Sequence, residues 1–166
     1  EVKVITNKTP FYGESGGQEG DRGTFKWKDG LAEVIDTIKL DNIIIHTAKI
    51  IKGTLKVNKI VFAEIDINRR NSLRIHHSAT HLLHESLRRN LGDHVTQKGS
   101  LVSEDKLRFD ISHNKPLQKD TLNKIEKDIN EQIRNNFNVS TNIMTIKDAQ
   151  SKGALALFGE KYGEKV

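Results

Sequence analysis

Three histidines at positions 77, 81 and 84 lie inside the stretch RIHHSATHLLHESLRRNLGDHVTQKGSLV, which begins at Arg74. Spacings of four and three residues bring side chains to one face of a helix. His77, His81, His84 and Arg88 fall within roughly 60° of one another around such a helix. The opposite half is mostly apolar. The pattern predicts an amphipathic helix with a histidine stripe where most helices carry Lys and Glu.

Histidines at i and i+4 can hold one metal ion, because both rings lie on the same side of the helix one turn apart. Two ligands do not complete a zinc site, which needs four, or three and a water. His84 or His76 could supply a third, although their angles suit a single ion less well. In HLLHE the glutamate follows the second histidine, unlike the H-E-x-x-H pattern of zinc proteases. A metal site and a solvated or core-satisfied histidine stripe therefore both remain open.

The stretch TPFYGESGGQEGDRG, from Thr9 to Gly23, places five glycines within fifteen residues. Such a loop is free to adopt positive φ, and its exposed backbone N–H groups can face a phosphate or a carbonyl oxygen. It matches neither a P-loop nor a dinucleotide-binding turn. By itself it is more typical of a surface loop between strands.

Composition sets broad limits on the function of this 166-residue chain. Hydrophobic residues make up 35% and charged residues 30%, and the formal charge of +5 permits a polyanionic partner without establishing one. No cysteine is present, so a metal site here must use His, Asp or Glu. We expect no membrane association and a cytoplasmic location, because the sequence has no apolar run of about 20 residues and no signal peptide. The chain begins without Met, so we expect it to be a piece of a longer protein.

The sequence to about Asn68 predicts β structure. Alternation around Asp29-Gly30 predicts a hairpin, and β-branched runs broken at Lys52-Gly53 and Asn58-Lys59 predict further short strands. Strands at this spacing are typical of a small barrel or sandwich. At NRRNS, from Asn68 to Ser72, the pattern changes from strand to helix, and we place a subdomain boundary there.

The second stretch mixes helices and strands. We expect a helix capped by Ser72 that runs to about Asn90 and ends near Gly92. Two strands are expected around a turn at Ser103–Asp105, followed by a helix that begins at Pro116. FNVSTNIMTI is predicted to form another strand. KDAQSKGALALFGEKYG is predicted to form a short helix followed by a tail interrupted by glycines. Segregated strands and helices predict an α+β fold.

Four segments together resemble the editing region of bacterial alanyl-tRNA synthetases. They are TPFYGESGGQEGDRG, HHSATHLLHESLRRNLGDHVTQKGSLV, LRFDISH and GALALFGEKYGEKV, and they occur in this order over nearly the whole chain. Free-standing alanyl editing proteins and the editing domain of threonyl-tRNA synthetase share parts of them. The resemblance implies a β-barrel subdomain over residues 1–68. It also implies an α+β editing subdomain of the threonyl/alanyl-tRNA synthetase second additional domain type over residues 69–166, which we expect to be truncated at its C-terminus.

The resemblance also implies an activity, a partner and a cofactor. The family hydrolyses the ester that joins serine or glycine to tRNA(Ala), because an apolar alanine pocket rejects neither strongly and a second site is required. The partners are the tRNA(Ala) acceptor end and the rest of the parent synthetase, whose ATP and alanine sites lie outside this sequence. Zinc would be bound by His77 and His81 with a Cys and a His from a later Cys-x-x-x-His segment. That segment is not in this sequence, so we expect weak metal binding or none.

Site residues carry over by motif position. Gln97 matches a polar residue of the editing pocket, where its amide could position a water or a serine hydroxyl. The expected pocket wall consists of Thr9, Gly16, Gly17 and Gln18. The candidates for phosphate contacts with the tRNA are Arg69, Arg70, Arg88 and Lys98. We expect His113 to be structural.

Two other functions remain open. The chain could be a non-catalytic module that binds the tRNA acceptor end, or an unrelated histidine-rich metal-dependent hydrolase. Hydrolysis of mischarged tRNA by this chain alone would argue against the first. Bound metal without affinity for tRNA would favour the second.

Overall fold

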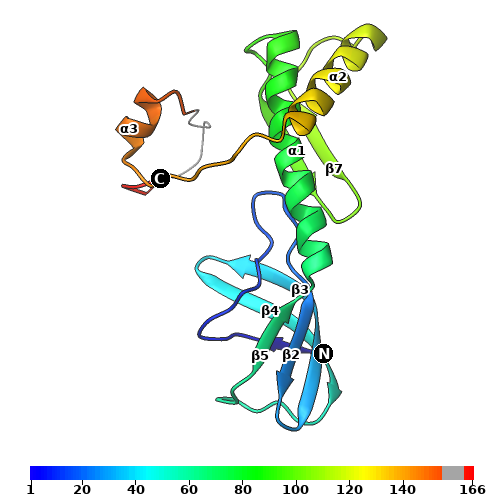
Figure 1. Ribbon diagram of the computed structural model, residues 1–166. Coiled ribbons are helices and arrows are strands. Elements are labelled where there is room, and N and C mark those ends of the chain that lie inside the picture. The colour runs from blue at the N-terminus through cyan, green and yellow to red at the C-terminus, as the bar shows by residue number, and fades with distance from the viewer. Residues whose placement is uncertain (155–162) are drawn as a thin grey trace. The chain divides into compact units, whose positions relative to one another are not determined.

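The computed structural model describes residues 1–154 and 163–166. These form two compact units, Glu1–Gln132 and Ile133–Val166. The elements, in chain order, are β1 (Val2–Val4), β2 (Gly23–Trp27), β3 (Gly30–Leu40), β4 (Ile43–Lys52), β5 (Phe62–Ile65), α1 (Ile67–Leu91), β6 (Gln97–Val102), β7 (Leu107–Ile111), α2 (Lys119–Asn135) and α3 (Ile146–Ser151) (Figure 1). The fold is α+β, as expected. The expected boundary between residues 68 and 69 lies inside the first unit and stays a prediction.

The first five strands form one antiparallel sheet in the order β1-β4-β3-β2-β5. The expected barrel is not identified, because no ladder joins the edge strands β1 and β5 in the described part of the chain. Closing a barrel requires its two edges to pair. The long hairpin β3–β4 is interrupted by register shifts between Leu31 and Ala32 and between Val34 and Asp36. Such irregularities bend the strands without joining the edges.

The expected first hairpin is confirmed, with its turn one residue earlier than the sequence indicates. The last pair of β2 and β3 is Trp27 with Gly30, so Lys28 and Asp29 form the two-residue connection. A Cβ atom on Gly30 would lie 2.2 Å from the Trp27 ring. The glycine therefore serves as a strand residue beneath an aromatic ring.

The core of the sheet is small and partly aromatic. Five fully buried side chains form it: Phe11, Phe25, Ala32, Val34 and Ala48. Because Phe11 belongs to the segment between β1 and β2, this core fixes one end of the glycine-rich loop on the sheet.

The N-cap of helix α1 lies six residues before the expected one. Asp66 is the N-cap, and its Oδ1 accepts a hydrogen bond from the backbone N–H of Arg69 at 3.0 Å. The expected cap at Ser72 is therefore wrong, because the polar residues before it form the first turns of the helix. The end at Gly92 is confirmed: its φ is 113°, and its N–H donates to the carbonyl of Arg88.

The hairpin β6–β7 packs beside α1, and the expected strands on either side of the Ser103–Asp105 turn are confirmed. A second core joins Leu87 of α1, Val95 and Ile125 of α2. Helix α2 begins at Lys119, three residues after Pro116.

The expected strand FNVSTNIMTI is wrong, since residues 137–145 contain no strand, only one isolated bridge at Thr145. The short helix expected after it is confirmed as α3. Most of its expected glycine-broken tail lies outside the described residues. Among the helices described, none is long and apolar enough to cross a membrane.

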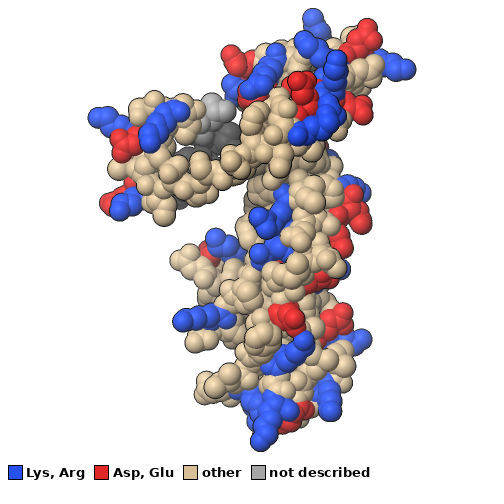
Figure 2. Space-filling model, in the orientation of Figure 1, with Lys and Arg blue, Asp and Glu red and all other residues tan. Residues whose placement is uncertain are grey.

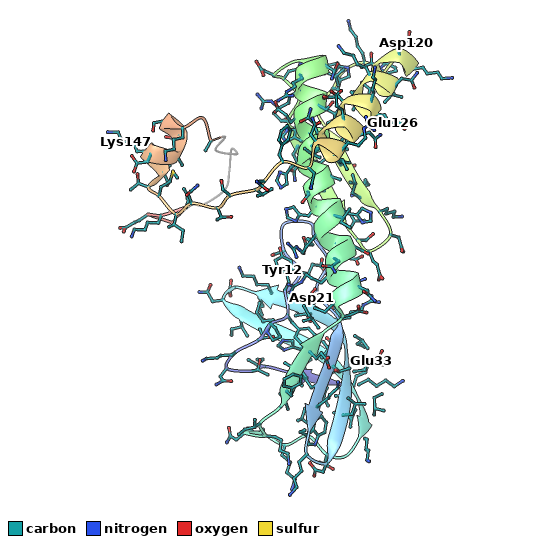
Figure 3. The ribbon with its side chains drawn as sticks, viewed as in Figure 1. Tyr12, Asp21, Glu33, Asp120, Glu126 and Lys147 are labelled. Atoms are coloured by element: carbon teal, nitrogen blue, oxygen red, sulfur yellow. The ribbon has the colours of Figure 1, made fainter. Side chains whose placement is uncertain are left out.

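Two consecutive arginines attach the start of α1 to the glycine-rich loop. Arg70 donates through Nε and Nη2 to the carboxylate of Asp21, which is only 1% exposed and also accepts the backbone N–H of Tyr12 at 2.7 Å. Tyr12 and Asp21 lie close together between the sheet and α1 (Figure 3). Arg69, 4% exposed, donates to Glu19 at 2.6 Å and to Glu104 at 2.8 Å. These bonds join the loop, α1 and the β6–β7 turn.

Replacing Arg70 by methionine should lower the free energy of unfolding by about 3 kcal/mol, because it leaves the buried Asp21 carboxylate without its charged partner. Urea unfolding measures the change. Arg74→Met is the matched control, since Arg74 is exposed on the same helix. Equal effects of the two substitutions would show that the ion pair does not stabilise the fold.

Candidate active site

The glycine-rich loop is hydrogen-bonded to strand β6 where it reaches α1. The carbonyl of Gly17 accepts from the N–H of Val102 at 2.7 Å, and the N–H of Glu19 donates to the carbonyl of Val102 at 3.0 Å. A Cβ atom on Gly17 would lie 2.4 Å from the carbonyl oxygen of Ser100. Only glycine therefore allows this close approach.

The tip of the loop is a tight turn from Ser15 to Gln18. Ser15 and Gln18 exchange two backbone hydrogen bonds, and both central residues have positive φ, 60° at Gly16 and 82° at Gly17. Such values at both central positions are typical of a type I′ turn. Within the described residues, no acceptor is found for the backbone N–H of Gly16 or Gly17. The turn thus presents two consecutive donors.

The turn places Gln18 against the histidine stripe. The Gln18 side chain is 6% exposed, and its Oε1 lies 2.6 Å from Nδ1 of His77. His77 and His81 are stacked, with ring centres 5.1 Å apart, and both are exposed. Partial burial, and secondly the charge of His81, lower the pKa of His77 below its ordinary value. The neutral ring is therefore favoured near pH 7.

His84 of the stripe and the neighbouring His76 face the β6–β7 hairpin. Nδ1 of His76 lies 2.8 Å from the carbonyl oxygen of Ser103. The His84 ring lies 5.0 Å from that of Phe109, and its buried Nε2 has no hydrogen-bond partner among the described residues. The histidine face is therefore the side of α1 that meets the loop and the hairpin.

His77 and His81 fit two positions of a metal site. Their rings lie one helical turn apart on an exposed surface, and an outer hydrogen bond to Nδ1 of His77 is typical of metal-binding histidines. In the part of the chain that the structure describes, no group of three or more His, Asp or Glu side chains could hold an ion. Among the described residues, His77 and His81 are therefore a pair of candidate ligands without the further ligands that a metal site needs.

Gln97, expected at the pocket, lies at the start of β6, while the loop meets the end of that strand at Val102. Five residues of strand correspond to roughly 16 Å. Gln97 and the neighbouring Lys98 are both exposed. The structure therefore brings Gln18, Gly17 and His77 together and leaves Gln97 apart from them.

Thr9, expected at the pocket wall, instead contacts the core of the sheet. Its hydroxyl lies 2.8 Å from Nε2 of His46, whose Nδ1 lies 2.9 Å from the carbonyl oxygen of Val4. The carbonyl can only accept, so Nδ1 of His46 carries the proton and Nε2 accepts from Thr9. His46 is fully buried against Phe11 and Phe25, and burial lowers its pKa.

The three expected tRNA-binding arginines bind acidic groups within the chain. Arg69 and Arg70 form the ion pairs described above, and Arg88 donates to Asp93 at 2.9 Å near the end of α1. These contacts argue against the phosphate contacts expected of Arg69 and Arg70. On the face drawn in Figure 2, basic and acidic side chains are interleaved.

An open hollow of about 650 Å³ lies elsewhere, along β2 and the start of α1. Thr24, Glu33, Glu64 and Asp66 are among the residues that line it. None of the expected pocket residues lines it, and of the expected tRNA-binding residues only Arg69 does. The hollow is therefore separate from the turn at Ser15–Gln18 and from the histidine stripe.

Several important residues were not expected from the sequence. Asp21 and His46 are buried polar anchors, and Glu19 and Glu104 hold Arg69. The adjacent charges Arg69-Arg70 and Glu19-x-Asp21 are visible in the sequence, but nothing in their spacing indicates that they pair across 49 or 50 positions.

Gly17→Ala should lift the loop from β6, because its Cβ would collide with the Ser100 carbonyl and its φ disfavours an L side chain. Hydrogen exchange should show faster exchange at the N–H groups of Val102 and Glu19. Gly16→Ala is the matched control, since it has similar strain but nothing within 4 Å of its Cβ. Unchanged protection in Gly17→Ala would contradict this packing.

The buried His46 should make stability depend on pH. Its folded pKa lies below the unfolded value of about 6.5, so the unfolded chain binds more protons as the pH falls. The free energy of unfolding should be fully present above about pH 6.5 and decrease below it. In His46→Gln this component should be absent, so urea unfolding should show native and variant converging from about pH 7.5 to pH 5. Parallel pH profiles would contradict it.

Comparison with known proteins gives two findings. Residues 1–69 match the family model of class II (A) tRNA synthetases. The chain is also 53% identical to the alanine–tRNA ligase of Ruegeria sp. over 165 residues, and 52% identical to that of Gluconobacter oxydans over 166. Identity to the Parvibaculum lavamentivorans alanine–tRNA ligase is 53% over 168 residues.

These alignments cover 99–100% of this chain but only 19% of each relative. The chain therefore corresponds, along nearly its whole length, to one segment of the alanine–tRNA ligases, which are aminoacyl-tRNA synthetases.

Proposed function

We propose that this chain is the editing segment of a cytoplasmic alanine–tRNA ligase and hydrolyses Ser-tRNA(Ala) or Gly-tRNA(Ala). The observation that carries the proposal is the contact between Gln18 of the glycine-rich loop and His77 of α1. These residues are 59 positions apart, and each belongs to a motif that the resemblance assigns to editing. At their contact, the backbone N–H groups of the turn lie near the imidazole rings of the helix.

The reaction is attack of water on the carbonyl carbon of an aminoacyl ester. The carbonyl oxygen gains negative charge, and the terminal ribose oxygen of the tRNA leaves with a proton. The N–H groups of Gly16 and Gly17 are suited to stabilise that developing charge, because a rigid turn fixes them before the reaction. When no metal ion occupies Nε2, the neutral ring of His77 is suited to accept a proton from water at that nitrogen.

Zinc held by His77 and His81 with further ligands would supply Lewis-acid polarisation of the ester or a bound water. A site that hydrogen-bonds the serine hydroxyl can discriminate strongly against alanine, which lacks that group. Gln97 stays a candidate for this contact by motif position, although it lies at the other end of β6 from the turn.

A second candidate is a non-catalytic module that binds the tRNA acceptor end with the rest of the synthetase. The charge of +5 and the exposed Lys98 favour it. Both candidates have tRNA(Ala) as the partner, so affinity alone does not separate them.

Deacylation of Ser-tRNA(Ala) separates the two candidates, with Ala-tRNA(Ala) as the control substrate. We expect this chain, or the chain extended by the family's Cys-x-x-x-His segment, to hydrolyse the serine ester with zinc present. His77→Ala should reduce the rate at least tenfold, because it removes an imidazole that touches the reacting groups. His113→Ala, which changes a histidine beyond β7, is the matched control.

If neither chain hydrolyses the serine ester while both bind tRNA, the binding module is correct and the hydrolytic proposal is wrong. Equal losses in His77→Ala and His113→Ala would also contradict the assigned role of His77.

A further inference from the structure

Gln18 has little freedom to move. Its backbone lies between two hydrogen bonds to Val102, one through the carbonyl of Gly17 and one through the N–H of Glu19. Its own N–H and carbonyl are bonded to Ser15. With 6% of the residue exposed, its amide group has a fixed place beside His77.

The contact has a direction. The Gln18 atom that lies 2.6 Å from His77 is the amide oxygen, which can only accept a hydrogen bond. With the amide in this orientation, Nδ1 of His77 donates. In a neutral imidazole only one nitrogen carries a proton, so Nε2 is left with a lone pair.

We infer that Gln18 is a positioning residue that holds neutral His77 in its Nδ1–H tautomer, which leaves Nε2 as the atom that binds a metal ion or accepts a proton. This inference deepens the proposed hydrolytic function and rests on it for its chemical meaning. An unconstrained histidine side chain in water favours the opposite tautomer, with the proton on Nε2. The amide of Gln18 therefore stabilises the tautomer that the isolated ring does not favour.

The rest of the structure offers two reference histidines. Nδ1 of His76 donates to the carbonyl of Ser103 and Nδ1 of His46 to the carbonyl of Val4, at 2.8 and 2.9 Å. A backbone carbonyl has no alternative orientation, so these two rings have the Nδ1–H tautomer without ambiguity. A side-chain amide can turn over, and donation from its nitrogen would give His77 the opposite tautomer.

Nitrogen-15 NMR of the histidine rings, at about pH 8 where histidine is neutral, tests the inference. We expect Nδ1 of His77 at the shift of a protonated nitrogen and Nε2 at that of an unprotonated one, as in His46 and His76. Gln18→Leu removes the acceptor, so His77 should move toward the Nε2–H tautomer while the two references stay unchanged. Gln18→Glu keeps an acceptor and should preserve the native pattern.

A native His77 protonated on Nε2 would overturn the inference, as would a native pattern that persists in Gln18→Leu. The reference signals of His46 and His76 show whether each variant is folded. If Gln18→Leu does not fold, the native spectrum and Gln18→Glu still decide.

Hydrolysis of Ser-tRNA(Ala) by the same proteins is measured separately. If His77 has the expected tautomer but the protein does not hydrolyse Ser-tRNA(Ala), only the proposed function is contradicted. Hydrolysis by a chain with the opposite tautomer contradicts only the role of Gln18.

Discussion

The close approach of Gly17 to strand β6 is the constraint on which the candidate site depends. A side chain at this position would collide with the Ser100 carbonyl, so the loop can lie on the strand only because the residue is glycine. That packing buries Gln18 and brings its amide to His77. A backbone requirement in one motif thereby determines which atom of a second motif is available for chemistry.

Charged side chains in this part of the molecule hold its segments together. Arg69 and Arg70 were expected to meet tRNA phosphates, yet both lie against acidic groups of the same chain. The hydrogen bonds with Asp21 raise the pKa of Arg70 above its ordinary value, so the guanidinium stays charged at any ordinary pH. Leaving a buried carboxylate without its charged partner costs folding free energy. These contacts therefore hold the loop in place against α1.

The sequence predicts local features better than contacts between distant segments. The hairpins, the histidine helix and its end at Gly92 follow from alternation, helical spacing and glycine, which act over a few residues. The missed cap at Asp66 shows the limit of that approach, because NRRNS looks like a loop unless one knows that its arginines pair with the loop before β2. The burial of His46 and the separation of Gln97 from the turn depend on tertiary packing, so local pattern could not predict them.

The central claim is that the turn and the histidine stripe together form the substrate site. The most direct test is a crystal structure of this chain with a non-hydrolysable amide analogue of seryl-adenosine. We predict that the carbonyl of the analogue lies at the N–H groups of Gly16 and Gly17, next to His77. An analogue bound in the hollow along β2, with the turn and the histidines vacant, would contradict the account.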